Sequence, residues 1–228
     1  DADFDSDTDI NDVLAVVDFI LEEDFPTEDE FRNVDVNVDE EINIADVIIM
    51  VDIIYGGNAR TMAFDMNEIA FVDLIHDYKN YKLDLSIDYS GPVRGMELEL
   101  EYDDKLVNIL STDLSKAQTD VLVTSHRLGD GRVKVLIANL NSGIIESDQN
   151  MYLNIPLQFD GNDYQVSTVS LKGITIVGGD GSIIKSIART ESSEIKAIPV
   201  SFALQQNFPN PFNPVSYTHL RAHETQSD

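Results

Sequence analysis

Acidic and amide side chains recur at alternate positions in two short stretches that lie 34 positions apart. Their oxygen-bearing residues are Asp1, Asp3, Asp5, Asp9 and Asp12 in the first stretch and Asp35, Asn37, Asp39, Asn43 and Asp46 in the second. Asp7 and Glu41, at the seventh position of each, would add main-chain oxygens. Oxygen donors at loop positions 1, 3, 5, 7, 9 and 12 wrap one hard cation. Because the pattern supplies many protein oxygens and leaves little room for water, it predicts two calcium sites rather than magnesium sites.

The alternative is a solvated acidic run ahead of a helix, where carboxylates complement the helix dipole. A charge run has no reason to repeat its ligand positions, so the duplication favours metal binding. The second loop fits the pattern better, since it has Ile42 at position 8, where the first has Thr8. Position 6 needs a sharp turn with positive φ, but it is Ser6 and Glu40, at a cost of about 1 kcal/mol each.

Apolar residues follow each loop at helical spacing. They are Val13, Leu14, Val16, Val17, Ile20 and Leu21 after the first loop and Val47, Ile48, Met50, Val51, Ile53 and Ile54 after the second. The spacing predicts one helix per repeat, although the β-branched residues lower intrinsic helix propensity and burial must hold the helices. In the polar connector between the repeats, Pro26-Thr27 followed by Glu28-Asp29-Glu30 suits the first turn of a short helix.

Residues 1–56 resemble the dockerin family, in which two calcium-loop-and-helix repeats are joined by a linker. Dockerins have Asp at loop position 12, as at Asp12 and Asp46. The resemblance implies a small all-α module that binds two Ca²⁺ ions and recognises a cohesin partner through loop positions 10 and 11. Those positions are Ile10-Asn11 and Ile44-Ala45. The isoleucines would dock either on a separate partner or on a neighbouring domain of the same chain, and we favour the second arrangement.

The periodicity changes from helical to alternating after a linker predicted at residues 57–66. Leu83, Leu85 and Ile87 alternate with polar residues, as do the apolar residues of 96–100. Eight or nine such runs, separated by turn signals, predict an all-β sandwich over residues 67–192. Its segment 93–106 resembles an early strand and turn of cohesin-like sandwiches, which implies a cohesin-like module as the dockerin partner, in cis or in trans.

A carbohydrate-binding sandwich is the competing interpretation. The chain has no Trp, so a sugar platform would have to come from tyrosines such as Tyr78, Tyr81, Tyr89 or Tyr164, most of which we expect in the core or on strand surfaces. No catalytic constellation stands out. We expect His76 and His126 to lie on the surface and the pair Asp103-Asp104 to lie in a solvated turn.

The charge balance narrows the choice of partner. The chain has 42 Asp+Glu against 15 Lys+Arg, a formal net charge of -27, and residues 1–55 hold 19 of the acids and only one base, Arg32. Such an excess argues against nucleic acid and anionic membranes, whose binding depends on Lys and Arg. No apolar run approaches the roughly 20 residues of a membrane span. With no cysteine, disulfides and thiolate metal sites are excluded.

The carboxyl-terminal residues carry a second resemblance. Leu204 and residues 206–214 match the opening of the sorting domain recognised by the type IX secretion machinery of Bacteroidetes-like bacteria. This implies export to the exterior or surface of a Gram-negative cell, with residues 193–214 as linker and signal. Residues 215–228 are similar to a translated sequencing adapter and are excluded from functional argument, including the spaced pair His219 and His223.

These patterns together predict a fragment of a secreted or cell-surface bacterial protein, since the chain begins within a patterned segment and without Met. Its predicted function is non-catalytic: calcium binding and protein–protein assembly. The alternative is a carbohydrate-binding or scaffolding appendage of an extracellular polysaccharide-degrading enzyme whose catalytic domain lies upstream.

Overall fold

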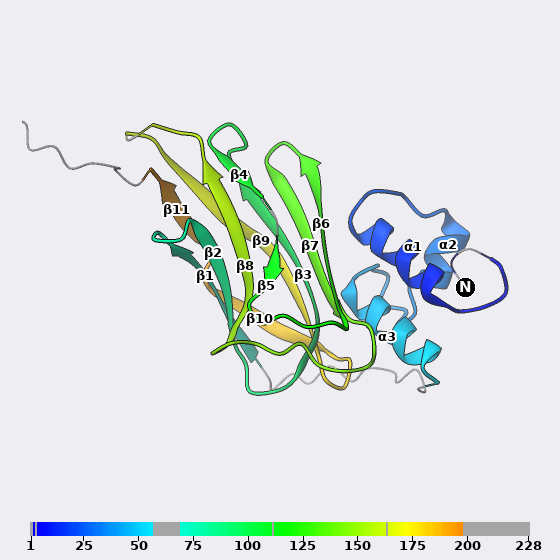
Figure 1. Cartoon of the computed structure of the whole chain (residues 1–228). Coiled ribbons are helices and arrows are strands. Elements are labelled where there is room, and N and C mark those ends of the chain that lie inside the picture. Colours follow the sequence, from blue (N-terminus) through cyan, green and yellow to red (C-terminus); the bar gives the residue numbers. More distant parts are fainter. Residues whose placement is uncertain (1, 3, 57–68, 111, 163, 198–228) are drawn as a thin grey trace, which may run out of the picture. The chain divides into compact units, whose positions relative to one another are not determined.

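The computed structural model describes residues 2, 4–56, 69–110, 112–162 and 164–197, which contain three helices followed by eleven strands (Figure 1). The helices are α1 (Ile10–Ile20), α2 (Glu28–Val34) and α3 (Ile44–Ile54). The strands are β1 (Ile69–Asp77), β2 (Lys82–Asp88), β3 (Val93–Tyr102), β4 (Val107–Ile109), β5 (Asp113–Leu114), β6 (Val121–Gly129), β7 (Arg132–Asn139), β8 (Met151–Phe159), β9 (Val166–Gly178), β10 (Ile183–Thr190) and β11 (Ser192–Lys196). The predicted linker at 57–66, the secretion signal at 202–214 and the adapter-like residues lie outside the described residues.

Each helix begins with a capping box. Asp9 caps α1 and Asn43 caps α3, and in both helices the carboxylate of an Asp three residues later accepts a hydrogen bond from the cap's backbone N–H. Thr27 caps α2 in the same way, at the start of the short helix that the sequence predicted. Such caps satisfy orphan N–H groups and each contributes about 1 kcal/mol. The residues at loop positions 9 and 12 therefore start the helices as well as standing in the predicted metal-ligand set.

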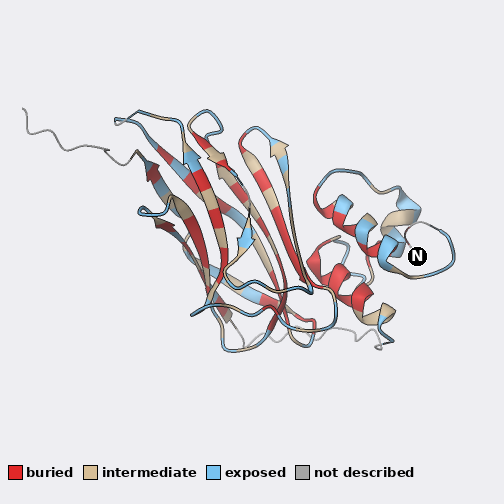
Figure 2. Cartoon of the chain, in the orientation of Figure 1, coloured by how far each residue is buried: buried red, intermediate tan, exposed pale blue. Residues whose placement is uncertain are grey.

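Burial holds the β-branched helices together. α1 packs against α3, and the two share one apolar cluster that also includes residues of the β-sheet. Its buried members are Ala2, Val13, Val16, Val17, Ile20, Leu21, Val34, Ile44, Ala45, Val47, Ile48, Met50, Val51, Leu136, Ala138 and Val177. The last three belong to β7 and β9. Within the described residues, the helices therefore share their apolar core with one face of the sheet (Figure 2).

The strands form a curled, mixed sheet that folds into two facing layers. Its order is β4-β8-β2-β1-β10-β9-β3-β7-β6, with β11 paired to β9 and β5 to β8. β10 joins the layers, because it pairs in parallel with β1 and antiparallel with β9. The inward residues of both layers make a second apolar core, which includes the alternating residues Leu83, Leu85, Leu98 and Leu100. The predicted all-β architecture is confirmed for this part of the chain.

Several strand details differ from the sequence prediction. The sequence pattern predicts two separate strands at residues 165–172 and 174–177, but they are one long strand, β9, whose register against β3 shifts at Lys172. A bulge of this kind inserts one residue without ending the strand, so the sequence pattern breaks there while the pairing continues. The short strands β4 and β5 were not predicted. All of β11 except Ser192 lies in residues that were predicted to be a linker. None of the helices that the structure describes has the length and apolar character needed to cross a membrane.

Candidate functional site

The second acidic loop is closed by hydrogen bonds that its own carboxylates accept from its backbone N–H groups. Asp46 is fully buried; its Oδ1 accepts from the N–H of Val36 at 2.9 Å and its Oδ2 from the N–H of Asn43 at 3.0 Å. Asp35 Oδ1 accepts from the N–H of Asp39 at 3.1 Å. The residues at positions 1 and 12 therefore draw the loop into a closed turn, with the predicted ligand residues gathered along it.

The first loop repeats this arrangement 34 residues earlier. Asp12 is 1% exposed; its Oδ1 accepts from the N–H of Ala2, and its Oδ2 accepts from the N–H of Asp9 at 2.8 Å. These bonds correspond to those that Asp46 makes. Asp1 and Asp3, the first two predicted ligands, lie outside the described residues. The two loops thus share a hydrogen-bond pattern as well as a residue pattern.

Both loops also have left-handed backbone at the same positions. The φ angle is 60° at Phe4 and Val38 and is 80° at Ser6 and 70° at Glu40. The positive φ predicted for position 6 is therefore present in both loops without glycine, at a cost on the order of 1 kcal/mol per residue. Val38 is 81% exposed, so no packing of its side chain offsets that strain. Strain of this kind persists only where the surroundings determine the conformation.

Burial has a large electrostatic effect on loop position 12. It raises the pKa of Asp46 to about 6, although three backbone N–H groups that bond to the carboxylate oppose the rise. The loop's own sequence supplies carboxylate and amide oxygen atoms, which are the hard donors that Ca²⁺ prefers. No group of three or more His, Asp or Glu side chains that could hold a metal occurs in the described ranges. The predicted ligands of the second acidic loop are carboxylates together with the amides of Asn37 and Asn43.

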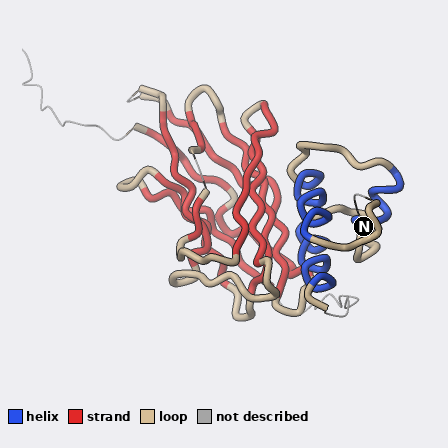
Figure 3. The backbone as a smooth tube through the Cα atoms, turned by 45° about the vertical axis from the view of Figure 1, so that its right-hand side comes forward, coloured by secondary structure: helices blue, strands red, loops and turns tan. Residues whose placement is uncertain are grey.

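The second repeat packs on the sheet through its helix, whereas the first repeat contacts the sheet by polar groups at the end of α1. α3 contacts β3, β7 and β9, and Figure 3 shows helices lying alongside the strands. Ile44 and Ala45, at loop positions 10 and 11, are fully buried, whereas Ile10 is 48% exposed and Asn11 is also exposed. The structure therefore places one of the two predicted partner-binding pairs against the chain's own sandwich and leaves the other facing solvent.

A glycine in β3 creates the space for this contact. A Cβ atom on Gly95 would lie 2.8 Å from Ile44 Cγ1, a distance that real Cβ atoms essentially never show, and 3.1 Å from Ile48 Cγ1, which is tighter than most Cβ contacts. Gly within a strand often marks a close approach by another backbone or side chain. The glycine within the alternating residues 93–102 is the sequence signal for this contact, which was not predicted.

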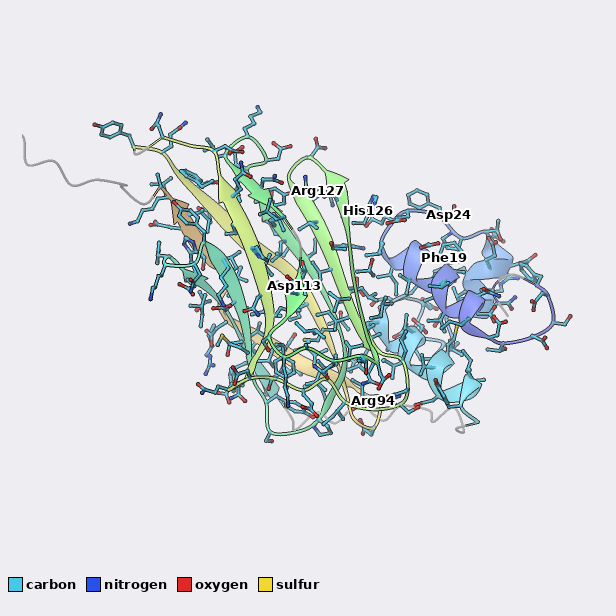
Figure 4. The ribbon with its side chains drawn as sticks, in the orientation of Figure 1. Phe19, Asp24, Arg94, Asp113, His126 and Arg127 are labelled. Carbon is cyan, nitrogen blue, oxygen red and sulfur yellow. The ribbon has the colours of Figure 1, made fainter. Side chains whose placement is uncertain are left out.

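An ion pair between β3 and α3 involves the residue next to Gly95 in the chain, Arg94, which is labelled in Figure 4. Arg94 is 4% exposed, and its Nη1 and Nη2 donate to the two carboxylate oxygens of Asp52 in α3, each at 2.8 Å. Ser142 Oγ donates to the same carboxylate at 2.9 Å. Bidentate pairs of this type fix geometry as well as charge. Arg94 and Asp52 are docking residues that sequence reasoning did not find, because nothing in the sequence links residues 42 positions apart.

The far end of α1 is held by weaker polar contacts. Lys134 Nζ lies 3.0 Å from Glu22 Oε1 and donates to the carbonyl oxygen of Ile20 at 3.0 Å. His126 Nδ1 lies 2.9 Å from Glu23 Oε1, on the side of the sandwich that Figure 4 shows facing α1. These groups are partly exposed, and such pairs contribute little to stability. They orient α1 rather than hold the module in place.

His76 contradicts the surface position that the sequence predicted. It is 8% exposed, and its Nδ1 lies 3.0 Å from the carbonyl oxygen of Glu194. Burial lowers its pKa, so the neutral ring with the proton on Nδ1 is favoured. The strand β11, which was not predicted, supplies that carbonyl and covers the ring. Of the tyrosines considered as sugar platforms, Tyr164 is 96% exposed and Tyr78 is 45% exposed.

One carboxylate of the sheet completes the start of α3. Glu97 in β3 accepts a hydrogen bond from the backbone N–H of Ile44, the first residue of the helix, and lies 4.0 Å from Lys134 Nζ. Its Oε2 is buried and has no hydrogen-bond partner within the described chain. Burial raises the pKa of Glu97, with Lys134 opposing the rise. The folded state therefore holds the proton on Glu97 more tightly than the unfolded state does.

We expect Glu97→Gln to flatten the pH dependence of stability. Because the folded-state pKa is raised, the free energy of unfolding falls as the pH rises from 4.5, the ordinary glutamate value, through the raised pKa. The amide keeps an acceptor for the N–H of Ile44 but does not titrate, so the variant should gain relative to the parent as the pH increases. Urea unfolding at a series of pH values measures this difference. The exposed Glu191→Gln serves as control, and an unchanged pH profile in Glu97→Gln would contradict the assignment.

The described residues thus form a two-layer β-sandwich whose one sheet carries a duplicated loop-and-helix module. No protein-family model matches the chain, and no curated protein matches it. Among solved structures it is similar to the sixth cohesin of scaffoldin B from Acetivibrio cellulolyticus, in complex with a Cel5 dockerin mutant, with TM-score 0.44 and 15% identity over 57% of this chain and 99% of that chain.

Two further structures show the same level of similarity. The Coh-OlpC–Doc435 complex, a type I cohesin–dockerin complex from Clostridium thermocellum, gives TM-score 0.44 and 14% identity over 62% of this chain and 99% of that chain. The second type II cohesin module of the ScaA scaffoldin of Acetivibrio cellulolyticus gives TM-score 0.44 and 12% identity over 58% and 98%.

Proposed function

We propose that this chain is a non-catalytic assembly unit in which a calcium-binding, dockerin-like module (residues 1–56) docks on the cohesin-like sandwich of the same chain. In this proposal each acidic loop binds one Ca²⁺ ion and shapes the start of the helix that follows it. Export by the type IX secretion machinery through residues 202–214, to the exterior or surface of a Gram-negative cell, is part of the same proposal.

The observation that carries the proposal is the seating of α3 on β3, β7 and β9. Loop position 10 of the second repeat, Ile44, is fully buried over Gly95, and the buried pair between Arg94 and Asp52 lies beside it. Apolar burial around a desolvated charged pair is the anatomy of a specific protein interface. The two predicted calcium loops lie directly before the helices that make and support this contact.

The proposed role of calcium is to fix the loops in their strained conformation. A cation bound by residues 35–46 would favour the ionised form of the buried Asp46 and would organise the positive φ angles of Val38 and Glu40. Since α3 begins inside that loop, the metal would also set the orientation of the docked helix.

We expect calorimetric titration of the calcium-free chain to show two binding events. Asp46→Ala and Asp12→Ala should each remove one event, because each deletes the position-12 ligand of one loop. Calcium at one hundred times its dissociation constant should add about 2.7 kcal/mol per site to the free energy of unfolding. Asp104→Ala, which removes an exposed acid outside the loops, should leave both events intact. Absence of calcium-dependent stabilisation in the parent chain would refute the metal part of the proposal.

A further inference from the structure

A small cleft opens where the end of α3 meets the sandwich. It is lined by Tyr55, residues 119–122, Leu140 and Asn141 and has a volume of about 360 Å³. Tyr55 follows the last residue of α3, whereas the other lining residues lie at the start of β6 and just after the end of β7. The cleft therefore exists only while α3 is docked, and it is separate from the acidic loops and from the Gly95 contact.

The lining combines one aromatic ring with a small set of polar groups. Tyr55 is 64% exposed, and Val121, Leu122 and Leu140 give an apolar, partly buried wall. Asp120 and Thr119 are exposed, and their side chains make no hydrogen bond to other described residues. Asn141 uses its Oδ1 to accept from the N–H of Gly143 at 3.1 Å, which leaves its amide N–H groups available. Apolar walls with a few placed polar groups are typical of small-molecule sites.

The charge of the lining limits the class of ligand. Asp120 is its one charged side chain at neutral pH, so an anionic ligand would be repelled. A simple cation would use the ring of Tyr55 and the carboxylate of Asp120, but it would leave the amide of Asn141 and the hydroxyl of Thr119 without a partner. One ring, one carboxylate, one amide and one hydroxyl suit a neutral molecule with an apolar face and several hydroxyl groups. A pyranose ring has these properties.

We propose that this cleft binds a neutral saccharide, whose ring stacks on Tyr55 and whose hydroxyls bond to Asp120, Asn141 and Thr119. The site goes beyond the proposed assembly function; it requires the docking of α3, and no residue of the acidic loops lines it. It would give the chain a second kind of partner on a surface that neither the helical module nor the sandwich makes alone.

Titration of the full chain with cellohexaose, xylohexaose and mannohexaose, followed by NMR chemical-shift changes, tests the proposal. We expect at least one of the three to bind, and Tyr55→Ala and Asp120→Ala each to weaken that binding by about tenfold or more. Tyr164→Ala removes a tyrosine that is 96% exposed, against 64% for Tyr55, and lies far along the chain; it should leave the affinity unchanged. Thermal unfolding establishes that each variant is folded. If Tyr55→Ala does not fold, the affinity of Asp120→Ala for the oligosaccharide tests the site.

Three results would overturn the proposal. The first is that none of the three oligosaccharides binds at millimolar concentration. The second is that Tyr164→Ala weakens binding as much as Tyr55→Ala does. The third is that butylammonium, a model of a lysine side chain, binds the cleft more tightly than the sugars and shows the same dependence on Tyr55, which would identify the site as a cation site. Binding that is unchanged in the presence of a calcium chelator would separate this site from the acidic loops.

Discussion

Replacing Gly95 by valine is expected to displace α3 from the sheet. The new Cβ would lie 2.8 Å from Ile44 and within 3.2 Å of two atoms of Ile48, both of which are fully buried and cannot retreat without moving the helix. Overpacking a tight contact costs about 1–3 kcal/mol. Displacement would also expose Leu136 and Ala138, which belong to the shared apolar cluster.

Hydrogen exchange measures the effect of Gly95→Val directly. Amide protection should fall across α3 while the inner strands of the sandwich keep theirs, and the urea midpoint should decrease. Gly173→Val is the matched control: Gly173 lies in the neighbouring strand β9, and its added Cβ would meet no atom within 4 Å. Full protection of α3 in Gly95→Val would show that the helix does not depend on this contact.

Asp52→Ala is expected to have the second large effect. The change leaves the guanidinium of Arg94, whose side chain is 5% exposed, without its carboxylate partner. Removing one member of a buried ion pair costs about 3–5 kcal/mol, because an uncompensated charge remains in a low-dielectric site. Denaturant unfolding of parent and variant measures the loss, and hydrogen exchange shows whether it falls on α3.

Two further variants separate the cost of leaving the Arg94 charge unpaired from the cost of shortening a side chain. Arg94→Met in the Asp52→Ala background removes the stranded charge, so we expect it to recover part of the stability. Arg32→Ala removes a guanidinium that is 72% exposed and pairs with Glu28 and Asp29 within α2, and it should change stability by less than about 1 kcal/mol. Equal losses in Asp52→Ala and Arg32→Ala would contradict the buried-pair account.

The local structure was predictable from residues that act over short distances. The apolar spacing after each acidic loop predicted α1 and α3, although the capping boxes at Asp9 and Asn43 were not predicted. The period-2 pattern likewise predicted β2 and β3. The long strand β9 was divided in two because a bulge breaks the alternation without ending the pairing.

The docking interface could be anticipated only in outline. The isoleucines at position 10 predicted packing against a partner or a neighbouring domain, but not which repeat would pack, because Ile10 and Ile44 are equivalent in the pattern. The choice depends on shape: the space over Gly95 and the carboxylate-binding fork of Arg94 are created only when β3 lies between β7 and β9. The burial of His76 has the same origin, since β11 reaches it from 118 residues away.

The covalent connection between α3 and the sheet raises the affinity that a competing partner needs. α3 ends at Ile54 and β1, the first strand of the sheet, begins at Ile69, so fourteen residues join the helix to the sandwich. Tethering at this length gives an effective concentration on the order of millimolar. An untethered helix of equal intrinsic affinity, present at micromolar concentration, would therefore occupy this surface in only about one molecule in a thousand. Any outside partner must be about a thousandfold tighter, or must act on a chain in which the tether has been cut.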